Sequence, residues 1–237
     1  ALVELAETLG CGVIDAEGRF AFPNTHPLDV TGARERVLHD ADVVLALDVP
    51  SLGVPLGPSV RERGALQPAT RPDTTVIHIT LLDQERQNWV TDNMWLLPVA
   101  IPIAADTAQA VPLLITACRE RLAANPEAVV TVEKRRASIS ALHDETRVTA
   151  AKWITDNWDA TPISAARLLG EIASRVKGKD WAMVHSHGRR MRDVLEVTEH
   201  PHEIGGGRGG GVGYGLPSSV GAALAYKGTG RLCVSIV

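Results

Sequence analysis

Short apolar runs separated by helical patterns dominate the first half of the chain, and this order constrains the fold more than any other feature. Residues 43–47 (VVLAL) and 76–79 (VIHI, within the strand expected at 75–80) are almost continuously apolar, which is typical of strands buried on both faces. Amphipathic patterns at 1–9, 33–39 and 107–122 accompany these runs. Strands and helices in this order predict an α/β fold in which helices cover parallel sheets.

The rest of the chain extends this prediction to a second unit. Further strands are expected at 12–14, 99–103, 181–185 and 232–237, and further helices at 164–176 and 217–226. We predict two three-layer parallel-sheet units, a Rossmann-like domain over 1–122 and a second domain over 162–237, joined by a helical connector at 123–161. The helical pattern at the first residue and the strand pattern at the last indicate a piece of a longer protein.

Composition and charge exclude several classes of protein. The 237 residues are 45% hydrophobic and 22% charged, the balance of a globular protein. The formal net charge is -4 and no basic face stands out, so nucleic acid is not expected as a partner. No apolar run approaches the ~18 residues of a membrane span, so no membrane partner is expected. Cys11, Cys118 and Cys233 lie in apolar sequence, which predicts buried free thiols and a cytoplasmic location.

Glycine is concentrated between residues 205 and 215, where eight of the chain's 21 glycines lie. Such a density indicates backbone that approaches another group closely. A flexible linker would not run directly into Leu216-Pro217 and a small-residue helix. A dinucleotide fingerprint would need glycine or alanine at position 216, and a P-loop would need a Gly-Lys-Ser/Thr run that is absent here. We interpret the stretch as a wall against which a cofactor lies.

This Gly-rich stretch, followed by Leu216-Pro217, a small-residue helix and an apolar strand, resembles the thiamine-diphosphate enzymes of the acetolactate synthase and benzoylformate decarboxylase family. The resemblance covers nearly the whole chain, from most of the family's central domain to the start of its diphosphate-binding domain. It implies that Val212, beside Gly211, supports the bent cofactor and donates its backbone N–H to the aminopyrimidine ring. The carbonyl of Gly210 would accept from the exocyclic amine of that ring.

The resemblance also implies a diphosphate-contacting loop after the strand at 181–185. His185, Ser186 and His187 lie at the carboxyl end of this strand, where ligands bind in open parallel sheets. Hydroxyl and imidazole groups are suitable hydrogen-bond donors to phosphate oxygens. His185 fits a core histidine equally well.

In this family the cofactor adds to a 2-keto acid and stabilises the carbanion left when carbon dioxide leaves. We therefore expect an acetolactate-synthase-like carboligase or decarboxylase, that is, a thiamine-diphosphate-dependent transferase or lyase, with a 2-keto acid as substrate. A benzoylformate-decarboxylase-like lyase and a non-catalytic relative that keeps the fold are the alternatives. Val212 is smaller than the Met or Leu usual at its position, which leaves the reaction open.

Other parts of the family's site are expected outside residues 1–237. The family's catalytic glutamate comes from the amino-terminal domain of a neighbouring subunit, which implies a homodimer or homotetramer and no catalytic residue in this chain. The Mg²⁺ ligands of the family follow its last strand here, beyond residue 237, so the chain alone is expected to be inactive. FAD is not expected, because Asp48-Val49-Pro50 stands where FAD-binding members have Arg-Phe-Asp.

A second polar group has the residue types of a metal site. His200, His202 and Glu203 lie within four positions, but Pro201 predicts an extended segment and no further ligands are near in sequence. We expect a surface or loop role for this group and no metal.

The arginines and tryptophans allow simpler expectations. Three arginines are expected either to add positive charge near an anionic ligand or to lie at the surface: Arg189, Arg190 and Arg192. Four tryptophans are expected to anchor packing: Trp89, Trp95, Trp153 and Trp158.

Overall fold

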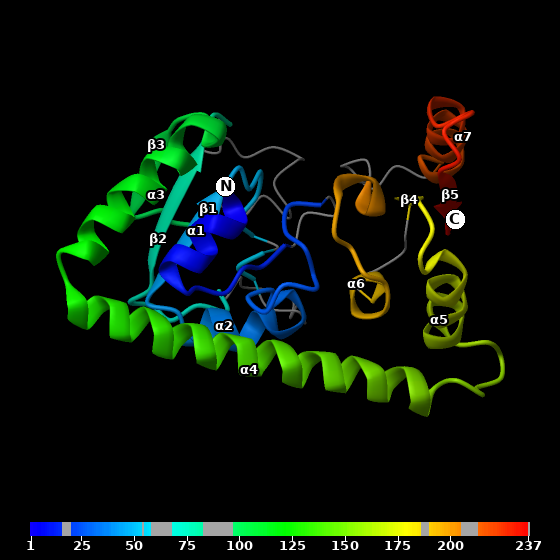
Figure 1. Ribbon diagram of the computed structural model, residues 1–237, viewed down its shortest axis with the longest axis horizontal. Coiled ribbons are helices and arrows are strands. Elements are labelled where there is room, and N and C mark those ends of the chain that lie inside the picture. Colours follow the sequence, from blue (N-terminus) through cyan, green and yellow to red (C-terminus); the bar gives the residue numbers. More distant parts are fainter. Residues whose placement is uncertain are drawn as a thin grey trace. The chain divides into compact units, whose positions relative to one another are not determined.

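The computed structural model describes residues 1–15, 20–53, 55–57, 68–82, 97–185, 190–204 and 213–236 (Figure 1). The chain forms two compact units: unit 1 comprises residues 1–12 and 33–137, and unit 2 comprises residues 13–32 and 138–237. The segment 13–32 thus groups with the carboxyl-terminal half, although both of its flanks in sequence belong to unit 1. The domain limits expected at residues 122 and 161 stay a prediction.

Unit 1 contains a three-stranded parallel sheet. Its strands, in the spatial order β1-β2-β3, are β1 (Val43–Leu47), β2 (Thr75–Thr80) and β3 (Ile101–Ala104). Its helices are α1 (Leu2–Leu9), α2 (Arg34–Asp40), α3 (Thr107–Ala123) and the first part of α4 (Pro126–Asp156). A 3-10 turn, η1 at Thr31–Ala33, contains the last two residues of the segment 13–32 and the first residue after it. Parallel strands alternating with helices confirm the predicted α/β fold.

The core of unit 1 lies between the sheet and two of its helices. Leu5 of α1 packs with Val111 and Ile115 of α3, and none of the three is more than 6% exposed. Leu45 and Leu47 of β1 pack against this group. Helices α1 and α3 therefore cover the face of the sheet that carries the odd-numbered residues of β1.

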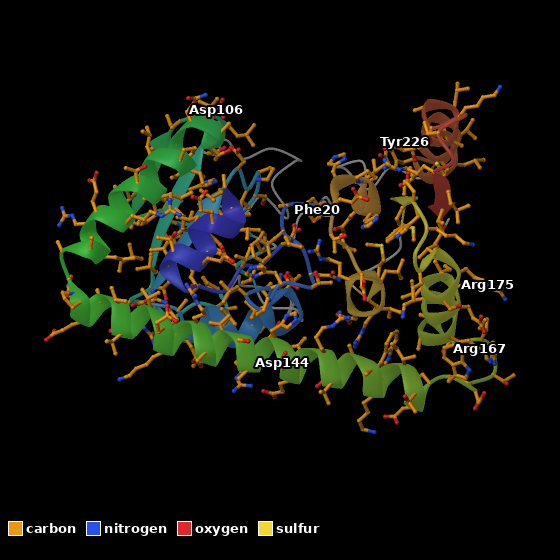
Figure 2. All side chains as sticks on the ribbon, viewed as in Figure 1. Phe20, Asp106, Asp144, Arg167, Arg175 and Tyr226 are labelled. Carbon is orange, nitrogen blue, oxygen red and sulfur yellow. The ribbon has the colours of Figure 1, made fainter. Side chains whose placement is uncertain are left out.

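Two helices begin at caps that satisfy free amides of the first turn. The carboxylate of Asp106 accepts from the backbone N–H of Ala108 at 2.9 Å, at the predicted start of α3 (Figure 2). In unit 2, the hydroxyl of Ser164 accepts from the backbone N–H of Arg167 at 3.1 Å, at the start of α5 (Ala165–Val176). Such a cap contributes about 1 kcal/mol.

Helix α1 ends in a left-handed residue that only glycine fits. Gly10 has φ 58°, and a Cβ at this position would lie 2.5 Å from the carbonyl oxygen of Val132 in α4. Arg135 of α4 donates through Nε to the carbonyl of Gly10 at 3.3 Å and through Nη2 to that of Leu9. A positive charge at the last turn of α1 is favourable because carbonyl dipoles converge there.

Several expectations for the strands are wrong in detail. Residues 12–14 form no strand, because Val13 makes only an isolated bridge to Asp29. Strand β3 begins at Ile101 instead of residue 99. Burial on both faces is also wrong for β1, since Val43 is 51% exposed and Ala46 is the one fully buried residue of this strand. Only β2, which pairs on both sides, is largely buried.

Unit 2 contains a second parallel pair of strands, β4 (Trp181–His185) and β5 (Leu232–Ser235). Its helices are the second part of α4, then α5, α6 (Met191–Val194) and α7 (Gly215–Ala225), with a 3-10 turn η3 at His200–Glu203. The helical connector expected at 123–161 is present as α4, which runs through residues of both units.

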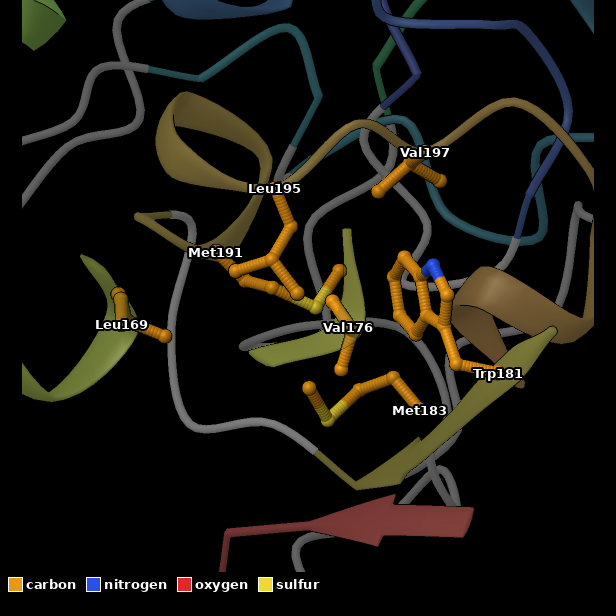
Figure 3. Close-up of a cluster of buried hydrophobic side chains, with 7 residues drawn as sticks. All are labelled: Leu169, Val176, Trp181, Met183, Met191, Leu195 and Val197. Carbon is orange, nitrogen blue, oxygen red and sulfur yellow. The ribbon is translucent and has the colours of Figure 1, made fainter. Parts of the chain in front are cut away.

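The core of unit 2 combines α5, β4, α6 and the chain after α6 (Figure 3). Its buried residues are Leu169, Val176, Trp181, Met183, Met191, Leu195 and Val197. From the segment 13–32, Phe20 packs against this core, and Phe22, Leu28 and Val30 of the same segment are at most 1% exposed. Burial of such side chains stabilises a fold by about 1.5–3 kcal/mol each, so this segment is an integral part of unit 2.

Two of the four tryptophans lie among the described residues, and both pack as expected. The ring of Trp158 packs against Gly170 in α5. A Cβ added to Gly170 would lie only 2.6 Å from ring atom Cζ3. The guanidinium of Arg190 lies 4.6 Å from the ring centroid of Trp153, a cation–π distance. Trp89 and Trp95 lie outside the described residues.

Candidate functional site

The carboxyl ends of β4 and β5 meet at one edge of the sheet of unit 2. His185 at the end of β4 pairs with Ser235 at the end of β5, and the register is irregular between Met183 and His185. Ligands of open parallel sheets bind outside this edge. The predicted diphosphate-contacting loop starts here, directly after β4.

Helix α7 begins at the same edge. The hydroxyl of Ser219, in its second turn, donates to the hydroxyl of Ser235 at 2.7 Å and lies 2.5 Å from the carbonyl oxygen of Gly215. Gly213, two residues before the helix, has φ 99°, a conformation that favours glycine. Pro217 in the first turn costs no hydrogen bond, because the first amides of a helix have no partner within it.

Most of the predicted site residues lie outside the described residues. These are Ser186 and His187 after β4, and Gly210, Gly211 and Val212 in the Gly-rich stretch. His185 is the last residue of β4. The structure therefore describes the parts of the chain that directly precede and follow each of the two predicted loops.

The chain that leads into the Gly-rich stretch is anchored at three points. The backbone N–H of Ile204 donates to the carbonyl of Met183 in β4 at 2.9 Å. The carbonyl of Glu203 accepts from the backbone N–H of Phe20 at 3.2 Å. The carboxylate of Glu203 is 2.5 Å from Nη1 of Arg192. The last described residues before the Gly-rich stretch are thus tied to β4, to α6 and to the segment 13–32.

Arg192 is the centre of a buried ionic cluster. It is 8% exposed, and its Nη1 donates to both Glu203 and Asp15, the latter at 2.9 Å. Its Nη2 donates to the carbonyl of Phe22 at 2.7 Å. Asp15 also accepts from the backbone N–H groups of Ala21 and Phe22, at 2.9 and 3.1 Å. The guanidinium of Arg192 therefore joins α6 to the segment 13–32 and to Glu203, which lies two residues before the Gly-rich stretch.

Asn24 forms a reciprocal clamp from the segment 13–32. Its Nδ2 donates to the carbonyls of Arg192 and Leu195 at 2.7 and 2.8 Å. Its Oδ1 accepts from the backbone N–H of Val197 at 2.8 Å, and its own N–H donates to the carbonyl of Val197 at 3.0 Å. With 1% of its surface exposed, Asn24 supplies hydrogen bonds that water cannot replace.

Burial shapes the charges around this cluster. Burial raises the pKa of the Glu203 carboxyl, although the guanidinium of Arg192 opposes the shift. Burial likewise raises the pKa of Asp29, against a hydrogen bond from the Thr31 hydroxyl at 2.6 Å and the charge of Arg192. Glu203 and Asp29 thus both lie in the field of one buried guanidinium, and removal from water favours the protonated forms of these two carboxyl groups.

A pH-dependent stability follows from the raised pKa of Glu203. The folded state holds this proton more tightly than the unfolded chain, so the stabilisation is complete below the ordinary glutamate pKa and is lost as the pH rises through the raised value. The difference in unfolding free energy, wild type minus Glu203→Gln, should therefore fall over the range of pH above the ordinary glutamate pKa of about 4.3. Denaturant unfolding at each pH measures it, and a difference that rises over this range would contradict the assignment.

The group at 200–203 corrects two expectations. Pro201 does not keep the segment extended, since η3 is a 3-10 turn with the proline in its first positions. His202 is not at the surface: it is 8% exposed and stacks on Trp181 with the centroids 4.0 Å apart. Its Nδ1 accepts from the backbone N–H of Thr198 at 3.2 Å, and burial lowers the pKa of its ring. His202 is therefore a neutral packing side chain, whereas His200 is exposed as expected.

The predicted role of one arginine is also corrected. Arg192 is neither a free charge for an anion nor a surface residue, because it is buried and two carboxylates already neutralise it. Arg190 lies at the surface, which is one of its two expected roles: its side chain is 54% exposed, and it pairs with Asp193 at 3.2 Å in addition to its contact with Trp153. Arg189 lies outside the described residues. The sequence pattern missed Asp15 and Asn24 altogether, since their partners lie more than 160 positions away.

The chain matches neither a protein-family model nor a curated protein. Across the described part of the chain, no three His, Cys, Asp or Glu side chains are grouped in a way that could hold a metal ion. None of the helices described has the combination of length and apolar character needed to cross a bilayer. The function must therefore be inferred from the residues and from the frame around the carboxyl edge of β4 and β5.

Proposed function

We propose that this chain forms one wall of a thiamine diphosphate site in an acetolactate-synthase-like enzyme that acts on a small 2-keto acid. The position of α7 carries the proposal. Its first turn follows the Gly-rich stretch directly and lies at the carboxyl edge of β4 and β5. Ligands of open parallel sheets bind outside this edge, which supports a cofactor site here.

The residue types of the two predicted loops support the proposal. A glycine-rich backbone allows a flat aromatic ring to approach closely, and Val212 is the apolar side chain within it. Gly210 and Val212 would then hold the aminopyrimidine ring through backbone C=O and N–H, beside Gly211. Ser186 and His187 would donate to the diphosphate, with His185 at the end of β4 behind them. When bound, the cofactor supplies the electron sink for decarboxylation of the keto acid.

Other properties of the protein follow from the same proposal. We place the Mg²⁺ ligands beyond residue 237, the catalytic glutamate on a neighbouring subunit and the full-length protein in a homodimer or homotetramer. We place it in the cytoplasm, supported by three cysteines that are all free. These thiols are half-buried, so the full burial expected for them is wrong.

The test is calorimetric titration of the full-length protein that contains this chain with thiamine diphosphate and Mg²⁺. We expect saturable binding, and we expect Gly211→Val to weaken it at least about tenfold by filling the space beside the ring. Gly221→Ala is the matched control. Its Cβ would meet nothing within 4 Å, and alanine suits the interior of α7, so binding should equal wild type.

Product analysis then separates the alternatives. With a panel of 2-keto acids, a new carbon–carbon bond in the product supports a carboligase, whereas aldehyde alone supports the benzoylformate-decarboxylase-like lyase. Binding without turnover of any keto acid supports the non-catalytic relative. Absence of thiamine diphosphate binding to the wild-type protein would sink the proposal itself.

A further inference from the structure

The buried cluster around Arg192 lies between the two loops that the proposed function needs. Arg192 follows the loop at 186–189 by three residues, and Glu203 precedes the Gly-rich stretch at 205 by two. The two side chains meet at 2.5 Å within unit 2. The Arg192–Glu203 ion pair therefore links the chain directly after the loop at 186–189 to the chain directly before the Gly-rich stretch.

We propose that Arg192, acting through Glu203, is a positioning residue for the Gly-rich wall of the cofactor site. This inference rests on the proposed function. The ion pair is well placed for such a role, since Arg192 is 8% exposed and the carboxylate of Glu203 is 13% exposed, so water screens their attraction little. A binding site needs such supporting contacts because a wall displaced by about 1 Å loses its fit to the ligand.

The backbone around Glu203 turns this ion pair into a positional constraint. Its carbonyl is held by Phe20 and the next amide, that of Ile204, is held by Met183. Met183 is 1% exposed in β4, the strand that leads to the diphosphate-contacting loop. Glu203 is thus fixed through its side chain and its backbone at once. Loss of the side-chain anchor leaves the backbone contacts to hold the start of the wall alone.

Asp15 provides an internal control for this inference. Its carboxylate contacts the same Nη1 of Arg192, at 2.9 Å, and it is also buried. Its carboxylate also accepts hydrogen bonds from the backbone of Ala21 and Phe22. Unlike Glu203, Asp15 is not next to the Gly-rich stretch in the chain. Loss of either carboxylate removes one of the two ion pairs of Arg192. Only loss of the Glu203 carboxylate also removes a contact that anchors the residues directly before the Gly-rich stretch.

The experiment compares Glu203→Ala, Glu203→Gln and Asp15→Asn in the full-length protein. Unfolding measures the stability of each, and calorimetry measures its affinity for thiamine diphosphate in the presence of Mg²⁺. We expect Glu203→Ala to weaken the affinity about tenfold or more, the size of effect seen when a supporting contact of a binding residue is removed. Glu203→Gln keeps an oxygen that can accept from Nη1, and it should restore part of the loss. Asp15→Asn should stay within about threefold of wild type despite its lower stability.

The outcomes are distinct from those for the proposed function. If the wild type binds thiamine diphosphate but Glu203→Ala binds equally well, the positioning role is wrong and the proposed function stands. The role is also wrong if Asp15→Asn weakens binding as much as Glu203→Ala, since the cluster would then act only through stability. If Glu203→Ala does not fold, the Glu203→Gln variant decides. Wild-type affinity for thiamine diphosphate in this folded variant, with the dependence of that affinity on pH unchanged, overturns the positioning role of Arg192. If the wild type does not bind, both proposals fail together.

Discussion

Replacement of Asn24 with alanine is expected to destabilise unit 2 by about 2–5 kcal/mol, because it removes the Asn24 side chain as partner of three buried backbone groups. The carbonyl of Leu195 and the N–H of Val197 lose the side-chain partner shown for them, whereas the carbonyl of Arg192 keeps Nη1 of Arg147 as a donor at 3.3 Å. A group left without a partner costs about 1–3 kcal/mol when water cannot reach it. Denaturant unfolding followed by tryptophan fluorescence, to which Trp181 in the core of unit 2 contributes, measures the loss.

Asn157 offers the matched control for this substitution. Its Nδ2 donates a single bond to the carbonyl of Trp153 at 2.8 Å, in the same unit but partly exposed. Asn157→Ala should therefore cost only about 1 kcal/mol. Equal losses for the two alanine variants would show that Asn24 is no clamp. Asn24→Asp should be destabilised near neutral pH and recover on acidification, because a buried carboxylate faces two carbonyl oxygens until it is protonated.

Replacement of Gly10 with alanine is expected to loosen the packing of α1 on α4, at a cost of about 2–4 kcal/mol. A left-handed backbone costs a residue with a side chain about 1–2 kcal/mol. The new Cβ would also lie 2.5 Å from the carbonyl oxygen of Val132, so the end of α1 must shift. Hydrogen exchange of the α1 amides measures the effect, and faster exchange there than in wild type is the expected result.

Gly178 separates the two contributions to this loss. It has φ 72°, close to that of Gly10, but a Cβ there would meet nothing within 4 Å. Gly178→Ala should therefore carry only the conformational cost of about 1–2 kcal/mol, felt by the neighbouring α5 and β4. If both variants lose the same free energy, the contact with α4 contributes nothing and the explanation for Gly10 is incomplete.

Local patterns were sufficient to predict most helices and strands. The strand at Val43–Leu47 and the helix at Thr107–Ala123 appear in the structure where the sequence places them. Both depend on neighbours within a few positions, which a pattern can report. The run at 12–14 has the same apolar character as a strand, but its single bridge is made to Asp29 and depends on how the later chain packs. Local patterns cannot report such contacts.

The candidate site was predictable only in part, for the same reason. The parallel strands β4 and β5 and the start of α7 follow from local patterns, and these elements frame the predicted edge. The cluster around Arg192 does not, because Asp15 lies 177 positions away in sequence. A buried ion pair of this kind has no periodicity or composition of its own. The burial of His202 on Trp181 was missed for the same reason.

The membership of the segment 13–32 in unit 2 has a consequence for how the chain acquires its structure. During synthesis the segment emerges early, yet Asn24 and Phe22 find their partners only once residues 192–197 have been made. Contacts this distant in sequence slow folding, since a long loop must close before they form. Until then the apolar side chains of Phe22, Leu28 and Val30, at most 1% exposed in the folded chain, stay in water. Nascent chains that end before residue 192 are therefore expected to bind chaperones through these apolar side chains.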